Sequence, residues 1–455
     1  MRRYVLPLAL MLNACMPVTP TDTATRANIT ASTLPPMKTF GAPRPSRPAK
    51  SNVDLTNDFI DLSFRLESGR DLPLFTRFEN PISVRVTGAP PASLGSDLNK
   101  LLHRLRTEAG ISISQTAATQ PANITIQAVS RAEIRRALPH AACFVVPNID
   151  DISEYRTAKR TPKTNWAIMR ERKKLAIFLP NDASPQEVRD CLHEELAQAL
   201  GPLNDLYRLP DSVFNDDNVH TVLTGFDMMM LRAYYSPELR SGMTRGQVKA
   251  KLPGIFGRIN PGGNGRQAKF ASRTPRAWSQ AIQKALGPGA TPRERGVAAD
   301  QALKIATAMG WHDHRRAFAH YANGRILLSS DPKAAQQHFL AADRYYAATP
   351  GADLHRAYVA TQLAAHAITQ GDGDLALLLV GPHIDRAARN ENAILLSTLL
   401  LLRAEALDLN GRTAEARTVR LDSLGWARYG FGPDWAVRAK LREISSLSPL
   451  KKGRT

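Results

Sequence analysis

The sequence predicts an α+β domain with a mixed sheet over residues 55–250, followed by an all-α helical-repeat domain over residues 297–446. In the first region, short β-rich runs alternate with stretches whose apolar residues recur at helical spacing. In the second region, Ala- and Leu-rich helical patterns follow one another with only short breakers between them. A chain of 455 residues is long enough for both.

The α+β domain is predicted to form its sheet before a single long helix begins. Alternating apolar residues from Thr76 to Thr87 indicate the first strand, and Leu residues at helical spacing indicate a helix over Ser96–Ala109. A second helix is expected over Arg131–Leu138. Further strands are expected at 111–114, 123–129, 144–146 and 174–179.

The long helix is marked at both ends. Ser184 can cap its first turn, with Pro at the first helical position and Glu187 three residues after the cap. Gly201 and the Pro after it stop the helix. Glu195 falls inside the apolar face of this helix, where a carboxylate needs a partner, a metal, a raised pKa or a water-filled cleft.

The helix carries a degenerate form of a zinc-peptidase motif. Such peptidases place two His ligands four residues apart, with a Glu after the first His as general base. A frame that starts at His193 puts Ala197 at the second ligand position. We prefer the frame that starts at Glu194, because it keeps Glu195 as the base, the later Gly and a polar residue at each ligand position. The ligand positions are then Glu194, Gln198 and either Asn204 or Asp205.

Carboxylate and amide oxygens suit a hard cation better than zinc. We therefore expect no tightly bound cofactor. One alternative is a weakly bound divalent metal, Zn²⁺ or Ca²⁺. The other is that these polar side chains hold the loop after the helix through hydrogen bonds.

The pattern as a whole resembles the upper part of a zincin-like (metzincin-type) domain, and Ser236–Met243 resembles the turn whose Met, here Met243, lies under such sites. The Arg77–Gly88 strand, Cys143, the motif helix and the Ser-Gly-Met segment also resemble one uncharacterised family. That family is a domain of unknown function found in exported alphaproteobacterial proteins, and the resemblance implies no established activity. It covers roughly residues 55–250.

The start of the chain predicts export. Residues 1–15 combine Arg2 and Arg3 with a short apolar run and a Leu-x-Ala-Cys ending. This ending resembles a bacterial lipoprotein box, which implies lipidation of Cys15 and a periplasm-facing protein anchored to the membrane, the outer membrane being slightly favoured. Residues 16–54, rich in Pro, Thr and Ala, are expected to form a disordered tether.

Export makes Cys143 and Cys191 candidates for a disulfide, because the periplasm is oxidising. Residues 251–296 are predicted to be a basic Gly- and Pro-rich linker with one helix near 277–286, and residues 447–455 a basic tail. The net charge of +19 raises nucleic acid as a partner, but export excludes it. The favoured interpretation of this charge is a solvated surface without a specific partner, and the alternative is attraction to anionic envelope polymers or lipids.

The helical region 297–446 is most similar to tetratricopeptide repeats. Breakers near 331, 350, 372 and 411 separate the helices, and Ala334, Ala376 and Ala414 recur after corresponding breakers at intervals of 42 and 38 residues. The family's regular interval is about 34 residues. An α-solenoid of this type predicts binding of other envelope proteins.

Two functional interpretations remain open. The favoured one is a noncatalytic envelope lipoprotein with a pseudo-peptidase domain and a protein-binding helical domain. The alternative is a metal-dependent hydrolase of envelope peptides or cell-wall bonds, with Glu195 as general base.

Overall fold

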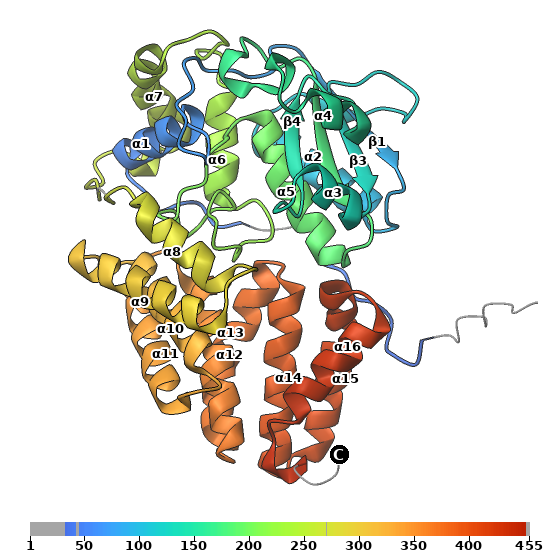
Figure 1. Cartoon of the computed structure of the whole chain (residues 1–455), viewed down its shortest axis with the longest axis vertical. Coiled ribbons are helices and arrows are strands. Elements are labelled where there is room, and N and C mark those ends of the chain that lie inside the picture. The colour runs from blue at the N-terminus through green and yellow to red at the C-terminus, as the bar shows by residue number, and fades with distance from the viewer. Residues whose placement is uncertain (1–31, 42–44, 270, 452–455) are drawn as a thin grey trace, which may run out of the picture.

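The computed structural model describes residues 32–41, 45–269 and 271–451. In Figure 1 the α/β part forms the upper half of the molecule and a bundle of helices forms the lower half. The sequence prediction of a mixed α/β region followed by an all-α region is confirmed at this level. The predicted signal peptide, Cys15 and the end of the basic tail lie outside the described residues.

A five-stranded mixed sheet organises the upper half. Its strands are β1 (Ile82–Gly88), β2 (Ile113–Gln115), β3 (Ile124–Val129), β4 (Phe144–Pro147) and β5 (Leu175–Pro180). Their order in the sheet is β2-β1-β3-β5-β4. The pairs of β1 with β2, β1 with β3 and β3 with β5 are parallel, whereas β4 runs antiparallel to β5 at an edge. Strand β1 is shorter than the predicted Thr76–Thr87, because Arg77 and Glu79 bind Ser241 instead.

Helices cover both faces of the sheet. Helices α2 (Leu94–Thr107) and α5 (Pro185–Leu200) pack on the face that includes Ile177, in the largest apolar core. Helices α3 (Arg131–Ala137) and α4 (Ile152–Ala158) pack on the opposite face with Phe178. The alternation along β5 thus buries both faces, as is typical of a strand covered by helices on each side.

Besides α4, three helices that the sequence patterns did not indicate complete the upper half. They are α1 (Asn52–Ser63), α6 (Gly225–Tyr234) and α7 (Arg245–Ile259). Aromatic rings of α1 and α6 stack around Phe75, with Phe59 and Tyr234 at 4.7 Å between centroids. This packing ties the start of the domain to the region after the motif helix.

The predicted linker 251–296 contains the end of α7, the helix α8 (Arg276–Leu286) and the start of α9 (Pro292–Ala308). Trp278 of α8 is fully buried in a core formed with α9 and the next two helices. The helix predicted near 277–286 is present, and it belongs to the helical half.

The described part of the predicted tether is residues 32–41 and 45–54. Residues 52–54 begin α1, and the remainder, residues 32–41 and 45–51, lies against the folded body. We call it the strap. Phe40 stacks on Trp426 at 4.5 Å between centroids, and Lys38 donates its backbone N–H to the Gly425 carbonyl. Leu34 joins a small apolar cluster in the last two helices. In Figure 1 this blue segment passes beside α16.

The lower half consists of helices that each pack on the next in sequence. After α9 they are α10 (His314–Leu327), α11 (Pro332–Ala347), α12 (Asp353–Thr369), α13 (Gly373–Arg389), α14 (Ala393–Leu409), α15 (Thr413–Phe431) and α16 (Asp434–Ser445). Gly351, Gly371 and Gly411 adopt positive φ in the turns, at the predicted breakers. None of the described helices combines the length and hydropathy needed to cross a bilayer.

Candidate functional site

Helix α5 is fixed firmly at both ends. The Ser184 side chain accepts the backbone N–H of Glu187, as the sequence predicts. At the other end the buried guanidinium of Arg172 donates to the carbonyls of Gln198, Ala199 and Gly201. A cation at the C-terminus of a helix satisfies its last carbonyls and its dipole. A Cβ at Gly201 would lie 3.0 Å from the Tyr234 ring, so the glycine allows this close packing.

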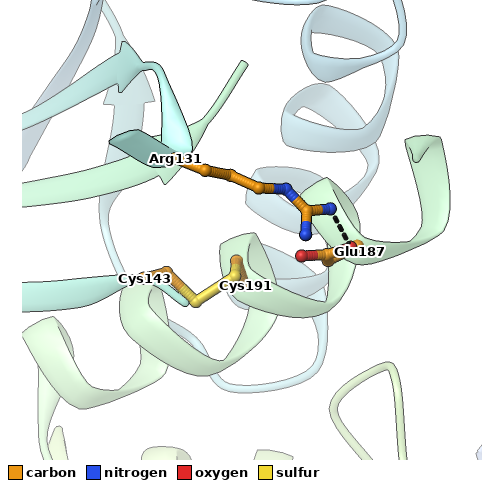
Figure 2. The surroundings of a disulfide bond; sticks show 4 residues. All are labelled: Arg131, Cys143, Glu187 and Cys191. Carbon is orange, nitrogen blue, oxygen red and sulfur yellow. Dashed lines mark hydrogen bonds and ion pairs between the residues drawn. A yellow bond between two sulfur atoms is a disulfide. The ribbon is translucent and has the colours of Figure 1, made fainter. Parts of the chain in front are cut away.

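A disulfide joins α5 to the sheet. Cys191 of α5 is bonded to Cys143, which precedes the edge strand β4, and their Cα atoms are 5.9 Å apart. Figure 2 shows a second link nearby, an ion pair of 2.5 Å between Arg131 of α3 and Glu187 in the first turn of α5. The predicted Cys143–Cys191 bridge is confirmed in the structure. It closes a loop over a sequence separation of 48 residues.

The N-terminal half of α5 docks on the helical half. The buried Arg189 guanidinium pairs with Glu391 in the turn between α13 and α14, with Nη1 and Oε2 2.7 Å apart. The rings of Phe40, from the strap, and Tyr429, from α15, each lie 5.2 Å from this guanidinium. Three separate segments therefore meet at one buried cation.

The motif side chains at the C-terminal half of α5 lie among other carboxyls. Glu195 is 5% exposed and its Oε2 has no hydrogen-bond partner, while Glu194 is partly exposed. The Gln198 Nε2 lies 3.5 Å from Oε1 of Glu67, a residue of the turn after α1. Five carboxyl groups influence one another here, and we call them the acidic cluster: Glu67, Glu194, Glu195, Asp205 and Asp216.

The acidic cluster has no cation paired with it. None of the ion pairs among the described residues includes any of its five carboxyls, although the whole chain carries a net charge of +19. Burial, then the charges of Glu67 and Asp216, raise the pKa of Glu194 to about 8. Burial, then the charges of Glu194 and Glu67, raise the pKa of Glu195. Carboxyls in this setting favour the protonated form near neutral pH.

The same causes raise the pKa values of the two Asp residues of the cluster. Burial, followed by the charges of Glu67 and Glu194, raises the pKa of Asp205 well above its usual value, and its Oδ1 lacks a partner. Burial and the charge of Glu67 raise the pKa of Asp216 to about 6. Such groups share protons, so they titrate together rather than one by one.

Asn204 and Asp205 begin a long loop that crosses into the helical half. Asn204 Nδ2 donates to the Asp61 carbonyl at 2.9 Å. Tyr207 inserts between helices, with its ring 5.1 Å from that of Trp278. Further along, Asp217 and the buried His355 of α12 are 2.7 Å apart. The loop from 202 to 223 thus contributes Tyr207 and Val219 to the cores of the helical half, whereas most of its other buried apolar side chains pack in the core of the upper half.

His193 is not part of the acidic cluster. Its Nδ1 accepts the backbone N–H of Leu223 at 3.1 Å, in a fully packed position. Burial, then the charges of Arg189 and Arg104, lower its pKa well below the usual value. In the frame that starts at His193, this imidazole would be the first metal ligand. In the structure its Nδ1 is instead used in a hydrogen bond to the backbone.

The residues at the ligand positions do not fit a peptidase zinc. Gln198 and Asn204 direct their amide N–H groups at oxygens, and an amide nitrogen is not a metal ligand. In the part of the chain that the structure describes, no group of three or more His, Cys, Asp or Glu is arranged to hold a metal ion. Among the described residues of the cluster, Glu195 Oε2 and Asp205 Oδ1 are the unpartnered atoms that a cation would satisfy.

Met243 packs at the edge of the largest core, and its backbone carbonyl accepts the N–H of Phe75. The adjacent Gly242 has a φ of 87° and donates to the Phe75 carbonyl. The turn that resembles a Met-turn therefore anchors the segment ahead of β1.

Two cavities lie near the cluster. A cavity of about 290 Å³ is bordered by Glu67, Asp205 and Asp216. A larger cavity of about 840 Å³ lies between α1, α7, the start of α10 and the end of α11. We call it the junction cavity. They share the side chains of Asp61, Arg208 and Arg273.

Sequence patterns did not reveal Glu67, Asp216 or Arg208. Each lies in an irregular segment without periodicity, and Glu67 is 131 residues away from Gln198. The cluster of two adjacent Asp residues at 216 and 217 was the only local signal.

Residues 52–254 match the model of a family described as "Protein of unknown function (DUF2927)". The match runs from the start of α1 into α7 and stops ahead of the helical half. Searches of curated proteins and of solved structures returned no match. The prediction that this region is a domain of unknown function is confirmed.

Proposed function

We propose that the chain is an envelope lipoprotein that works by binding, with a zincin-like domain that has lost peptidase chemistry. The observation that carries this proposal is the state of the ligand positions on α5 and in the loop after it. Gln198 and Asn204 use their amide groups to hold Glu67 and the α1 backbone, and Tyr207 of the following loop is packed into the helical half.

Two further features support the zincin-like origin. A mixed sheet with one antiparallel edge strand lies directly beside the motif helix, and a Met-containing turn follows it. The disulfide from the edge strand to α5 supports export, because such bonds persist in oxidising compartments. Lipidation at Cys15 follows from the sequence motif at the start of the chain.

The helical half is proposed to be a degenerate tetratricopeptide-like solenoid. Successive helices pack on their neighbours with glycine turns between them. Part of its surface already holds the 202–223 loop of the same chain. Partner proteins would therefore contact the remaining surface of the helical half and the junction between the halves.

One observation favours a second function, metal-assisted hydrolysis with Glu195 as general base. The Glu195 carboxylate is buried beside Glu194 without a partner for Oε2, and its pKa is raised, as in many general bases. This arrangement lacks the ligand set that would hold a metal-bound water.

Metal analysis and one matched substitution separate the two functions. The mature protein and its Glu195→Gln variant would be purified from detergent-solubilised membranes, dialysed, analysed for metal and assayed against a peptide library. We expect substoichiometric metal and the same absence of cleavage from both. Stoichiometric zinc, with cleavage that Glu195→Gln abolishes, would contradict the binding function.

The anchor needs its own test in the host cell. Metabolic labelling with an alkyne fatty acid should mark the wild type, and Cys15→Ser should lose the label and move the protein to the soluble periplasmic fraction. Cys143 and Cys191 are paired with each other, so they do not supply the label. Label retained in the Cys15→Ser protein would contradict the lipoprotein assignment.

A further inference from the structure

We propose that the junction cavity binds a phosphorylated sugar with two or more negative charges. The inference goes beyond the proposed function, because the cavity would take this ligand whether or not the motif helix is catalytic. The cavity is about 840 Å³, within the range of roughly 300 to 1,000 Å³ that small-molecule sites occupy.

The cavity is cationic even after its own ion pairs are formed. Seven Lys or Arg side chains line it against four Asp side chains, an excess of three positive charges. One of the four, Asp313, is paired with Arg315, which is not part of the lining. The cations that no carboxylate neutralises are therefore the most available ones.

Lys249, Arg266 and Lys269 make no ion pair among the described residues. Lys249 lies on α7, whereas Arg266 and Lys269 lie on the segment after it, and all three side chains are exposed. They border the same cavity from two directions. Like charges held around one space favour an anion between them.

The floor of the cavity presents under-used guanidinium groups. Arg245 and Arg273 each reach Oδ1 of Asp61 through a single nitrogen, at 3.3 and 2.9 Å. The buried Arg208 bonds Oδ2 of the same carboxylate at 2.9 Å and Asp58 with its other terminal nitrogen, so it fixes Asp61 in place. Burial alone would raise the pKa of Asp61, but the hydrogen bond and charge of Arg208, with Arg273, lower it. Arg245 and Arg273 therefore leave N–H donors free for a phosphate, which guanidinium binds through two parallel bonds.

Apolar and ring-shaped groups complete the cavity. Ile60, Pro210 and Pro350 border it together with the imidazole of His312. Such a surface suits a sugar ring placed between phosphates better than a bare inorganic ion. The same chemistry occurs in a free sugar bisphosphate and in a phosphorylated glycolipid headgroup, so the source must be distinguished by experiment.

The test uses the full mature chain and two probes. Glucose 1,6-bisphosphate would be titrated by isothermal calorimetry, and phosphatidylcholine vesicles with and without lipid A would be used in a flotation assay. The cavity variant is Lys249→Gln with Lys269→Gln. Its control is Lys304→Gln with Lys333→Gln, which removes the same charge from exposed, unpaired positions on α9 and α11.

We expect saturable one-to-one binding of at least one probe. The cavity variant should weaken that binding by about tenfold or more, since two direct charge contacts are lost, and the control should change it less than about twofold. Binding of both probes assigns the site to the headgroup in either form; binding of one assigns its source. Thermal unfolding followed by circular dichroism should be the same for both variants, because the substituted side chains are exposed.

Two results would overturn the proposal. One is the absence of saturable binding for both probes. The other is an equal loss of binding in the cavity variant and the control, which would show that the net charge of the chain attracts the probes without a site.

Discussion

Replacing Glu194 by Gln should remove much of the loss of stability that this protein undergoes as the pH rises from about 5 to about 8. The pKa of Glu194 is raised to about 8 by burial and then by Glu67 and Asp216, whereas an unfolded Glu titrates near ~4.3. When the folded pKa is raised, the stabilisation is present below the unfolded pKa and is lost as the pH rises through the folded pKa. Wild-type stability should therefore fall between about pH 5 and about pH 8.

The size of the effect follows from the shift. One pKa unit corresponds to about 1.4 kcal/mol, so three pH units correspond to about 4 kcal/mol. Glu194 is partly exposed, and solvent screening reduces this figure to about 2 to 4 kcal/mol. Gln imitates the neutral carboxyl, so the two proteins should unfold with similar free energies near pH 5 and differ by that amount near pH 8.

The assay is urea denaturation followed by circular dichroism at several pH values, with the disulfide intact. Asp385→Asn is the control, because it removes one exposed carboxylate of α13 that is in none of the ion pairs of the described residues. Parallel pH profiles for the wild type and Glu194→Gln would refute the reasoning. They would mean that the acidic cluster is already compensated in solution.

Three further predictions concern the links of α5 to the rest of the protein and the contact of α6 with the strap. Replacing Cys143 and Cys191 with Ser should lower the free energy of unfolding by about 4 kcal/mol, the loop-closure value for this separation, measured by urea denaturation; an unchanged midpoint would contradict it. Arg189→Met should cost about 3 to 5 kcal/mol because it leaves the Glu391 carboxylate buried alone, and adding Glu391→Leu should restore part of the loss. Gly225→Ala should release the strap to limited proteolysis, because the new Cβ would lie 2.0 Å from a strap carbonyl; a cleavage rate equal to that of the wild type would exclude this clash.

Local signals predicted the elements that form the sheet and the motif helix. Ser184, Pro185 and Glu187 define the start of α5, and the alternation from Asn123 to Val129 defines β3 with little error. Capping and periodicity act within a few residues, so a single sequence contains them. Helix α1 was not predicted because its segment follows a Pro- and Ser-rich stretch that dominated the composition.

The acidic cluster and the docking of the two halves could be predicted only in part. Glu194, Glu195 and Asp205 were chosen from the motif, but Glu67 joins them through a turn far away in the sequence. Arg172 caps the C-terminus of α5, but it lies in a run of basic residues that is typical of a solvent-exposed loop, so this role was not predicted. Such contacts depend on tertiary packing, which no local spacing encodes.

The placement of Tyr207 has a consequence for how this domain can be inherited. The matched region ends at residue 254, yet the Tyr207 ring lies between aromatic side chains encoded after that point, Trp278 and Phe318. A protein that consisted only of the matched region would expose the Tyr207 side chain and its loop to water. Any chain that contains this domain with an aromatic side chain at this position would need an equivalent shelter, either from its own flanking sequence or from a separate subunit.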